Sequence, residues 1–182
     1  MLSDAFLDWW FAPPGLPPAA DPLARRDRYP FWCAETGVRP DLPPAFDPGW
    51  QVAAVDAGAE LRQAAALFGG IVAARAQDHA LLARLALDQR RWCMSIAMTQ
   101  PLKDCGALPF APDDPAELRG LAELARRLEH GFPGLWTRWR LLLPAPLAGR
   151  VDGLLKDAAA PAEGSDSRVQ RCWQMCRGRA AA

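Results

Sequence analysis

The feature that most constrains the fold is a long interval without proline. The chain contains 18 prolines, yet none lies between Pro48 and Pro101. A proline inside a helix removes a backbone hydrogen bond and clashes with the preceding turn. In a chain this rich in proline, the interval therefore predicts where the helical core lies.

Apolar spacing divides this interval into two predicted helices. Apolar residues recur at three- and four-residue steps from about Ala59 to Gln77, and again from about His79 to Thr99. The second segment is apolar on most sides, which is typical of a central helix in a bundle, so we expect 79–99 to be the core element. Gly69 and Gly70 each cost the first helix about 1 kcal/mol relative to alanine. That cost predicts either close approach of a neighbouring backbone or a kink.

Shorter helices are predicted on both sides of this pair. Asp21 and Pro22 have the pattern of an N-cap followed by proline at the first helical position, and Asp114 with Pro115 repeats it. Pro30 is expected to interrupt the helix that begins near Pro22. Further helices are predicted over 1–12, 135–143, 147–157 and 168–177. Proline-rich connectors are predicted at 13–18 and 40–48, and a flexible linker at 158–167.

No segment has the pattern of a strand, so the predicted fold class is all-α. We expect a single irregular helical bundle with proline-rich N-terminal connectors and a central helix pair. It would occupy residues 1–157, with its core at 58–145, followed by a linker and a short C-terminal helix in 158–182.

Charge and composition exclude several classes of function. The formal net charge is zero, which favours neither nucleic acid nor an anionic membrane as a partner. The N-terminus lacks the basic start and apolar run of a secretory signal, and no apolar run is long enough for a membrane span. The five cysteines are odd in number and irregularly spaced, which indicates reduced thiols rather than a disulfide framework. We therefore expect a cytoplasmic protein.

The residues that could carry chemistry have simpler structural explanations. Cys172 and Cys176 share a helical face, but no second cysteine pair exists to complete a zinc site with His79 or His130. Asp78 would cap the helix that begins at His79, and His130 suits the dipole at a helix end. No catalytic residue, metal ligand or cofactor-binding residue is predicted, and we do not expect an enzyme.

The arginine pairs are interpreted as solvated helix faces because acidic residues lie near each pair in the sequence. These pairs are Arg25-Arg26, Arg90-Arg91 and Arg126-Arg127. The most basic stretch surrounds Trp173 near the C-terminus and leaves contact with nucleic acid or lipid open. Its arginines are Arg168, Arg171, Arg177 and Arg179.

Eight tryptophans are more than short peripheral segments normally bury. Tryptophan and arginine dominate protein interfaces, so a helical domain with surplus aromatic residues favours an adaptor over an enzyme. The alternative is that the rings pack inward on the long helices. The candidate protein-binding residues are Trp9, Trp10, Trp136, Trp139 and Arg140.

The layout of residues 46–145 resembles a known family. The segments LFGGIV at 67–72 and WTRWRLLLP at 136–144 look like the SctK group (YscK/PscK-type) of type III secretion accessory proteins. The N-terminal Trp9-Trp10-Phe11 has no counterpart in that layout. The resemblance implies a non-enzymatic adaptor that links the inner-membrane ring of a bacterial secretion apparatus to its SctQ-type pod protein. Such a protein would reach the cytoplasmic face of the inner membrane through its partners alone.

Two other classes of function stay open. A helical regulatory or chaperone-like protein would bind a peptide, an effector or nucleic acid in a groove lined by Leu87, Met94 and Met98. An enzyme would need a pocket where a cysteine thiolate meets His79 or His130.

Overall fold

Segments rich in alanine and leucine, separated by prolines, fold into helices throughout the computed structural model. The structure describes residues 1–17, 21–100, 102, 104–161 and 166–182. Within these ranges it contains helices and no strands, so the all-α prediction is confirmed. None of the helices in these ranges has both the length and the hydropathy needed to cross a lipid bilayer.

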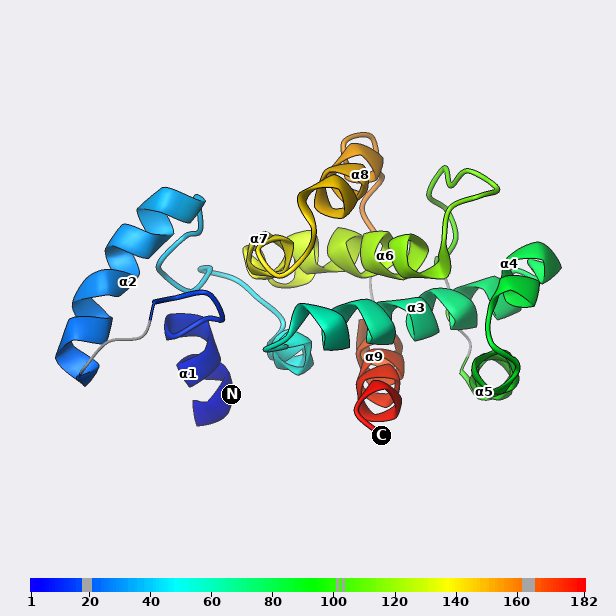
Figure 1. Ribbon diagram of the computed structural model, residues 1–182, viewed down its shortest axis with the longest axis horizontal. Helices are drawn as coiled ribbons and strands as arrows, with labels where there is room; N and C mark the ends of the chain where they lie inside the picture. Colours follow the sequence, from blue (N-terminus) through cyan, green and yellow to red (C-terminus); the bar gives the residue numbers. More distant parts are fainter. Residues whose placement is uncertain (18–20, 101, 103, 162–165) are drawn as a thin grey trace.

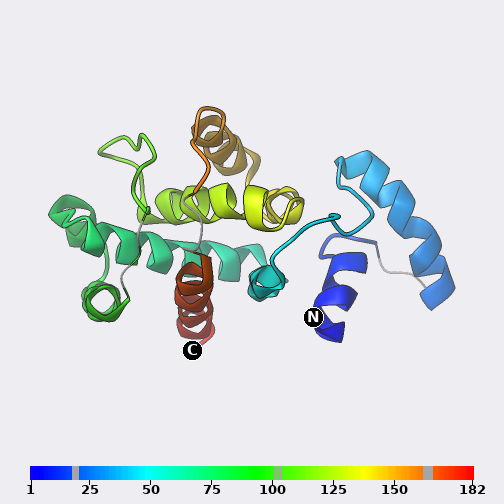
Figure 2. The same cartoon turned by 180° about the vertical axis from the view of Figure 1, so that it is seen from behind.

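The core is built around α3 (Gly58–Arg75), whose buried residues lie on every side of the helix. Helix α6 (Ala116–Gly131) lies against it along most of its length, and α9 (Asp166–Ala180) packs on another face (Figures 1 and 2). A Cβ atom added to Gly69 of α3 would lie 1.9 Å from the carbonyl oxygen of Ala116, and one on Gly120 of α6 would lie 1.9 Å from that of Ala65. Of the two alternatives expected at the glycine pair, the close backbone approach is therefore present.

The prediction of one central helix over 79–99 is wrong. The segment forms α4 (His79–Arg84) and α5 (Leu87–Thr99), with extended backbone at Leu85 between them. Gly70 has no side chain, and a Cβ there would lie 2.9 Å from Leu85 Cδ1 and 2.7 Å from Cys93 Sγ. The break lets Leu85 and both short helices pack against α3, which is the true central helix. As a result α5 buries one side only, through Cys93 and Ala97.

The N-terminal region forms α1 (Asp4–Phe11), α2 (Pro22–Thr36) and the 3-10 helix η1 (Pro48–Ala53). Ser3 caps α1 by accepting the N–H of Phe6 at 3.3 Å. The expected interruption at Pro30 is wrong, because α2 continues through that residue. The packing of Tyr29, Trp32 and Cys33 on the inward face of α2 offsets the hydrogen bond that proline removes.

The C-terminal half contains α7 (Leu135–Arg140) and α8 (Ala145–Leu155) in addition to α6 and α9. Helix α6 begins one residue later than predicted, with Pro115 at the N-cap. Asp114 does not cap it, because its carboxylate accepts the N–H of Ala111 at 2.8 Å and pairs with Arg150. Residues 162–165 of the predicted linker lie outside the described residues.

Helix α9 contributes to the core rather than lying beside it. Its inward side chains are Val169, Cys172, Trp173 and Cys176. The indole of Trp173 packs against that of Trp139 at a centroid distance of 5.2 Å. Arg177 also binds Glu60 at 3.0 Å, which ties the end of α9 to the start of α3.

One predicted solvated arginine pair is buried. Arg126 and Arg127 both bind the carboxylate of Glu123 at 3.1 Å, because positions three and four residues apart share one side of α6. The N–H of Gly106 donates to the same carboxylate at 2.5 Å. The loop that contains Gly106 therefore covers the buried ionic group of Glu123, Arg126 and Arg127. In the other two pairs, Arg26 and Arg91 are exposed and Arg90 is half-buried, while the side chain of Arg25 is outside what the structure describes.

Candidate functional site

Helix α2 stands at one end of the molecule, beside α1 and away from the α3–α6 core (Figure 1). Asp21 caps it by accepting the N–H of Ala24 at 2.8 Å, and Gly37 ends it in the left-handed conformation with φ 71°. The inward face of α2 forms a small separate cluster. That cluster consists of Tyr29, Trp32, Cys33 and Val38.

Tyr29 connects this cluster to the rest of the protein. Its ring stacks on Trp32 at 6.2 Å and meets the edge of Phe11 at 5.7 Å. Its hydroxyl donates to the carbonyl of Pro40 at 3.0 Å and accepts from Nη2 of Arg138 at 2.9 Å. Burial raises the pKa of Tyr29, so the phenol stays protonated as a donor.

Arg138 is a buried cation with no carboxylate partner among the described residues. Its guanidinium lies 3.3 Å from the centroid of the Trp10 ring, a cation–π contact. It also donates to the carbonyls of Arg39 at 3.1 Å and Gly134 at 3.4 Å. Burial lowers the pKa of Arg138. The group holds α1, α2 and α7 together.

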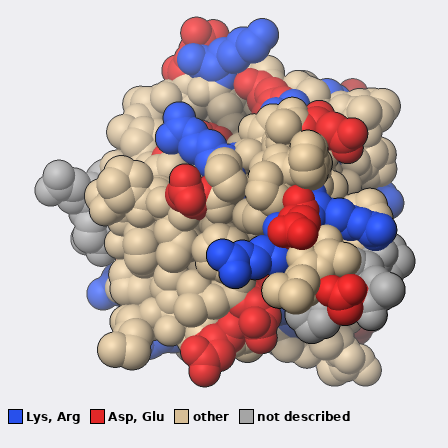
Figure 3. Space-filling model, turned by 90° about the vertical axis from the view of Figure 1, so that its left-hand side faces the viewer, with Lys and Arg blue, Asp and Glu red and all other residues tan. Residues whose placement is uncertain are grey.

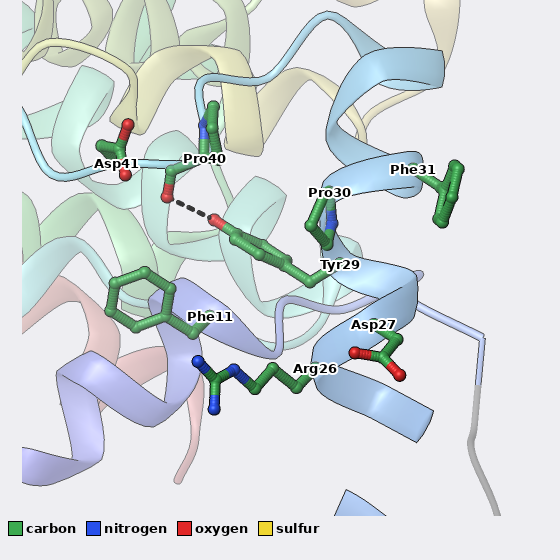
Figure 4. Close-up of a pocket in the computed structure, with 8 residues that line it drawn as sticks. All are labelled: Phe11, Arg26, Asp27, Tyr29, Pro30, Phe31, Pro40 and Asp41. Carbon is green, nitrogen blue, oxygen red and sulfur yellow. Dashed lines mark hydrogen bonds between the residues drawn. The ribbon is translucent and has the colours of Figure 1, made fainter. Parts of the chain in front are cut away.

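A pocket of about 780 Å³ opens between α2, the end of α1 and the loop at 40–41 (Figure 4). Its lining combines aromatic rings and prolines with three charged side chains. These residues are Phe11, Arg26, Asp27, Tyr29, Pro30, Phe31, Pro40 and Asp41. Such a lining suits an apolar side chain from another protein, with charged groups at the rim to orient it.

Exposed apolar side chains also lie on α2 and at the end of α1. Phe31 is 75% exposed, Leu23 is 72% exposed and Phe11 is 43% exposed. Around them, acidic and basic side chains alternate on the end of the molecule that carries α2, with uncharged surface between (Figure 3). We refer to Phe11, Leu23, Phe31 and the pocket as the α2 surface. It is a candidate protein-docking site.

A second exposed apolar surface lies on α5. Leu87, Met94 and Met98 all point away from the core, and Met98 is 85% exposed. A hollow of about 200 Å³ separates the two methionines from Ala74, Arg75 and Gln77 at the end of α3. We refer to Leu87, Met94, Met98 and this hollow as the α5 surface. It lies at the opposite end of the molecule from α2 (Figures 1 and 2).

The four tryptophans proposed for binding are buried, so the exposure expected of them is wrong. Each of three indoles donates to an internal acceptor: Trp9 to the carbonyl of Val55, Trp136 to Asp152 and Trp139 to the carbonyl of Ala53, at 3.0, 2.9 and 2.8 Å. Trp10 is fully buried beneath Arg138. These rings fill space between short helices, which is the inward-packing alternative. Of the five residues, Arg140 is exposed, and it pairs with Asp152 at 2.9 Å.

A helix that stops at Pro30 does not predict the α2 surface. Once 22–36 is one helix, Tyr29, Trp32 and Cys33 share a face, and Phe31 must point the other way. That opposition is the sequence signal for an exposed aromatic residue.

Four of the five thiols are buried. Burial raises the pKa of Cys93 to about 12 and that of Cys172 to about 11, and it raises the pKa of Cys33 and Cys176 as well. Cys105 is partly exposed, and burial raises its pKa to about 12. Within the described ranges, no three His, Cys, Asp or Glu side chains are grouped as metal ligands.

The two histidines have separate surroundings. His130 Nδ1 lies 2.9 Å from the carbonyl oxygen of Arg126, and His79 begins α4 next to its cap, Asp78. Asp78 accepts the N–H of Leu81 at 2.9 Å, so its predicted capping role is confirmed.

Comparison of the chain with protein-family models, curated proteins and solved structures found no match. The resemblance to the SctK group therefore stays a prediction.

Proposed function

We propose that this protein is a non-enzymatic adaptor that holds two other proteins together. The observation that carries the proposal is the pair of exposed apolar surfaces, on α2 and on α5, at opposite ends of one helical body. An adaptor needs two separated docking surfaces and a rigid connection between them. The core along α3 and α6 supports α5, and the hydrogen bonds of Arg138 to Tyr29 and to the carbonyl of Arg39 join α2 to α7.

The resemblance to the SctK group suggests the setting of this adaptor. In a type III secretion apparatus the two partners would be the pod protein and the cytoplasmic domain of the inner-membrane ring. The protein would then work at the cytoplasmic face of the inner membrane and reach the membrane through its partners.

A binding experiment tests this function. The purified protein, immobilised through one terminus, is incubated in turn with a pod protein and with a ring cytoplasmic domain from a type III secretion apparatus. We expect both to be retained, and we expect the double variant Leu23→Ala with Phe31→Ala to lose one of them. Leu141→Ala is the matched control, because Leu141 is 43% exposed and belongs to neither surface. Failure of both proteins to bind would reject the secretion setting.

The hollow beside Met94 and Met98 favours a second candidate, a regulatory or chaperone-like protein that holds a peptide or an effector. Methionine-rich surfaces adapt to many partners because the side chain is flexible and polarisable. Stable co-purification of a small effector or of nucleic acid, with no binding of ring or pod proteins, would favour this function over the adaptor.

A further inference from the structure

Four exposed residues of α5 form one narrow stripe. With 3.6 residues per turn, Leu87, Arg91, Met94 and Met98 fall within about 60° of the helix circumference. They span about 17 Å at a rise of 1.5 Å per residue. Three of the four are apolar, and all four are exposed. A helix of three turns laid alongside would cover the whole stripe.

The charge around the stripe is positive. Arg91 lies in the stripe, Arg90 flanks it, and exposed Arg75 of α3 lines the hollow. No carboxylate within the described ranges pairs with Arg90 or Arg91. Asp88, the one acidic residue of α5, binds Arg179 at 3.6 Å and so is already compensated. Acidic groups on a partner would find unpaired guanidinium groups here.

The hollow provides a place for a partner's side chain. It is bounded by Ala97 below, by Met94 and Met98 on one side, and by the end of α3 on the other. Arg75 is held at its edge, because Nη1 donates to the carbonyl of Ala97 at 3.3 Å. A volume of about 200 Å³ is enough for one large apolar side chain.

We infer that the α5 surface binds an acidic amphipathic helix of a partner protein. Its apolar residues would lie on Leu87, Met94 and Met98, one would enter the hollow, and its carboxylates would pair with Arg75, Arg90 and Arg91. The inference rests on the proposed adaptor function and gives the chemistry of one of its two partners.

Two other occupants fit the surface less well. A second copy docked through the same face by a two-fold axis would bring Arg91 of both copies together, which costs free energy through like-charge repulsion. An anionic membrane would satisfy the arginines, but it would make no use of a hollow shaped for one side chain.

The test uses fluorescein-labelled peptides and the full-length protein. One peptide of about 16 residues carries leucines at three- and four-residue steps with flanking glutamates, a second replaces every glutamate by lysine, and a third scrambles the first. Fluorescence anisotropy at low and at moderate salt gives the dissociation constants. We expect the acidic peptide to bind at least about tenfold more tightly than the other two, and this preference to shrink as salt screens it.

Variants then locate the binding site. Met94→Ala with Met98→Ala is expected to weaken binding of the acidic peptide about tenfold. Arg91→Glu should weaken the acidic peptide and tighten the lysine peptide. These side chains are exposed, so both variants should keep the thermal unfolding midpoint of the parent protein. Leu23→Ala with Phe31→Ala, at the far end, is the matched control and should bind normally.

Four results would overturn the inference. Two come from the peptide assay: equal binding of the three peptides, or full binding by the methionine double variant. The other two point to another occupant: a wild-type dimer in sedimentation that Met98→Glu dissociates, or binding to vesicles of equal parts phosphatidylserine and phosphatidylcholine that the double variant loses. None of these results rejects the adaptor function if the α2 surface still binds one protein and another surface binds a second. If no protein is retained by the full-length chain at all, the proposed function itself fails.

Discussion

Gly69 and Gly120 set the distance between α3 and α6. A Cβ atom on either glycine would lie 2.9–3.0 Å from the backbone nitrogen of the other, so the two backbones are in direct contact. Neither backbone can move aside for a new side chain without pushing α3 and α6 apart. At these two positions the absence of a side chain is a packing requirement rather than a demand for unusual backbone angles.

Gly120→Ala should therefore destabilise the protein by about 3 kcal/mol, because the new methyl group would lie 1.9 Å from the Ala65 carbonyl oxygen. The measurement is the free energy of unfolding from urea titration. Gly149→Ala in α8 is the matched control, since a Cβ there meets nothing within 4 Å, and it should stabilise by about 0.5–1 kcal/mol. Equal stability of the Gly120 variant and the parent would show that α3 and α6 are not in contact here.

Buried thiols make the stability fall at alkaline pH. The unfolded chain loses its cysteine protons near pH 8.5, whereas burial raises the pKa of Cys93 to about 12 and of Cys172 to about 11. Stability is complete below the unfolded pKa and is lost as pH rises through the folded pKa, by up to about 1.4 kcal/mol per pH unit for each thiol. Urea titrations at about pH 8, 9 and 10 should show this decline. Cys172→Ala should start lower and decline less steeply, and an unchanged slope would contradict the assignment.

At the scale of single residues, apolar spacing predicted that 59–77 is helical, and the glycine pair predicted either a close backbone approach or a kink, of which the close approach is present. The burial of Trp9, Trp10, Trp136 and Trp139 could not be predicted in the same way. Their pockets are made by short helices from distant parts of the chain, and two of the indole N–H groups donate to backbone carbonyls far away in sequence, those of Val55 and Ala53.

Among the elements, α2 packs in a cluster that is separate from the main core. Its link passes through Tyr29, which bonds both the Pro40 carbonyl and Arg138, and through the contact of Tyr29 with Phe11. The α2 surface depends on this link, because Tyr29 and Pro40 both line its pocket. Local unfolding of such an element costs less free energy than unfolding the core.

Tyr29→Phe should release α2 while the core stays folded. The variant leaves the Pro40 carbonyl without its donor and Arg138 Nη2 without the hydroxyl acceptor, a cost of about 1–3 kcal/mol. Amide hydrogen exchange should become faster in 22–36 and stay unchanged in α3 and α6. Faster exchange throughout the molecule would mean that α2 unfolds together with the core instead.

Element boundaries show where sequence patterns stop being informative. Asp21, Asp78 and Gly37 act locally, so the sequence predicted two of these caps correctly. The break at Leu85 depends on tertiary packing against Gly70, whereas α2 continues through Pro30 with its inward side chains in a cluster of its own. At Leu85 a contact far along the chain outweighed the local preference.

At the scale of the whole molecule, α9 closes the core although it is the last helix of the chain. Trp173 packs on Trp139, Gln170 donates to Asp47 at 2.5 Å, and Arg177 binds Glu60. Asp166 at its start lies 3.8 Å from Arg127 of the buried ionic group. The packing of the core, on which the proposed adaptor function relies, therefore includes a segment that the sequence pattern separates from the rest by a linker.

A chain ending at residue 157 should consequently fail to fold cooperatively. It would uncover Trp139 and the α9 side of α3, and it would remove the partner of Asp47 and one carboxylate beside Arg127. Uncovering several fully buried side chains costs about 1.5–3 kcal/mol each, which is comparable with the entire stability of a domain of this size. We expect loss of the near-ultraviolet circular dichroism signal and a broad, non-cooperative urea transition. A chain ending at residue 180 is the matched control and should unfold like the parent, since it keeps the whole of α9. If the shorter chain unfolded cooperatively at the parent's midpoint, α9 would be an appendage, and the rigid connection between the α2 and α5 surfaces would have to come from α3 and α6 alone.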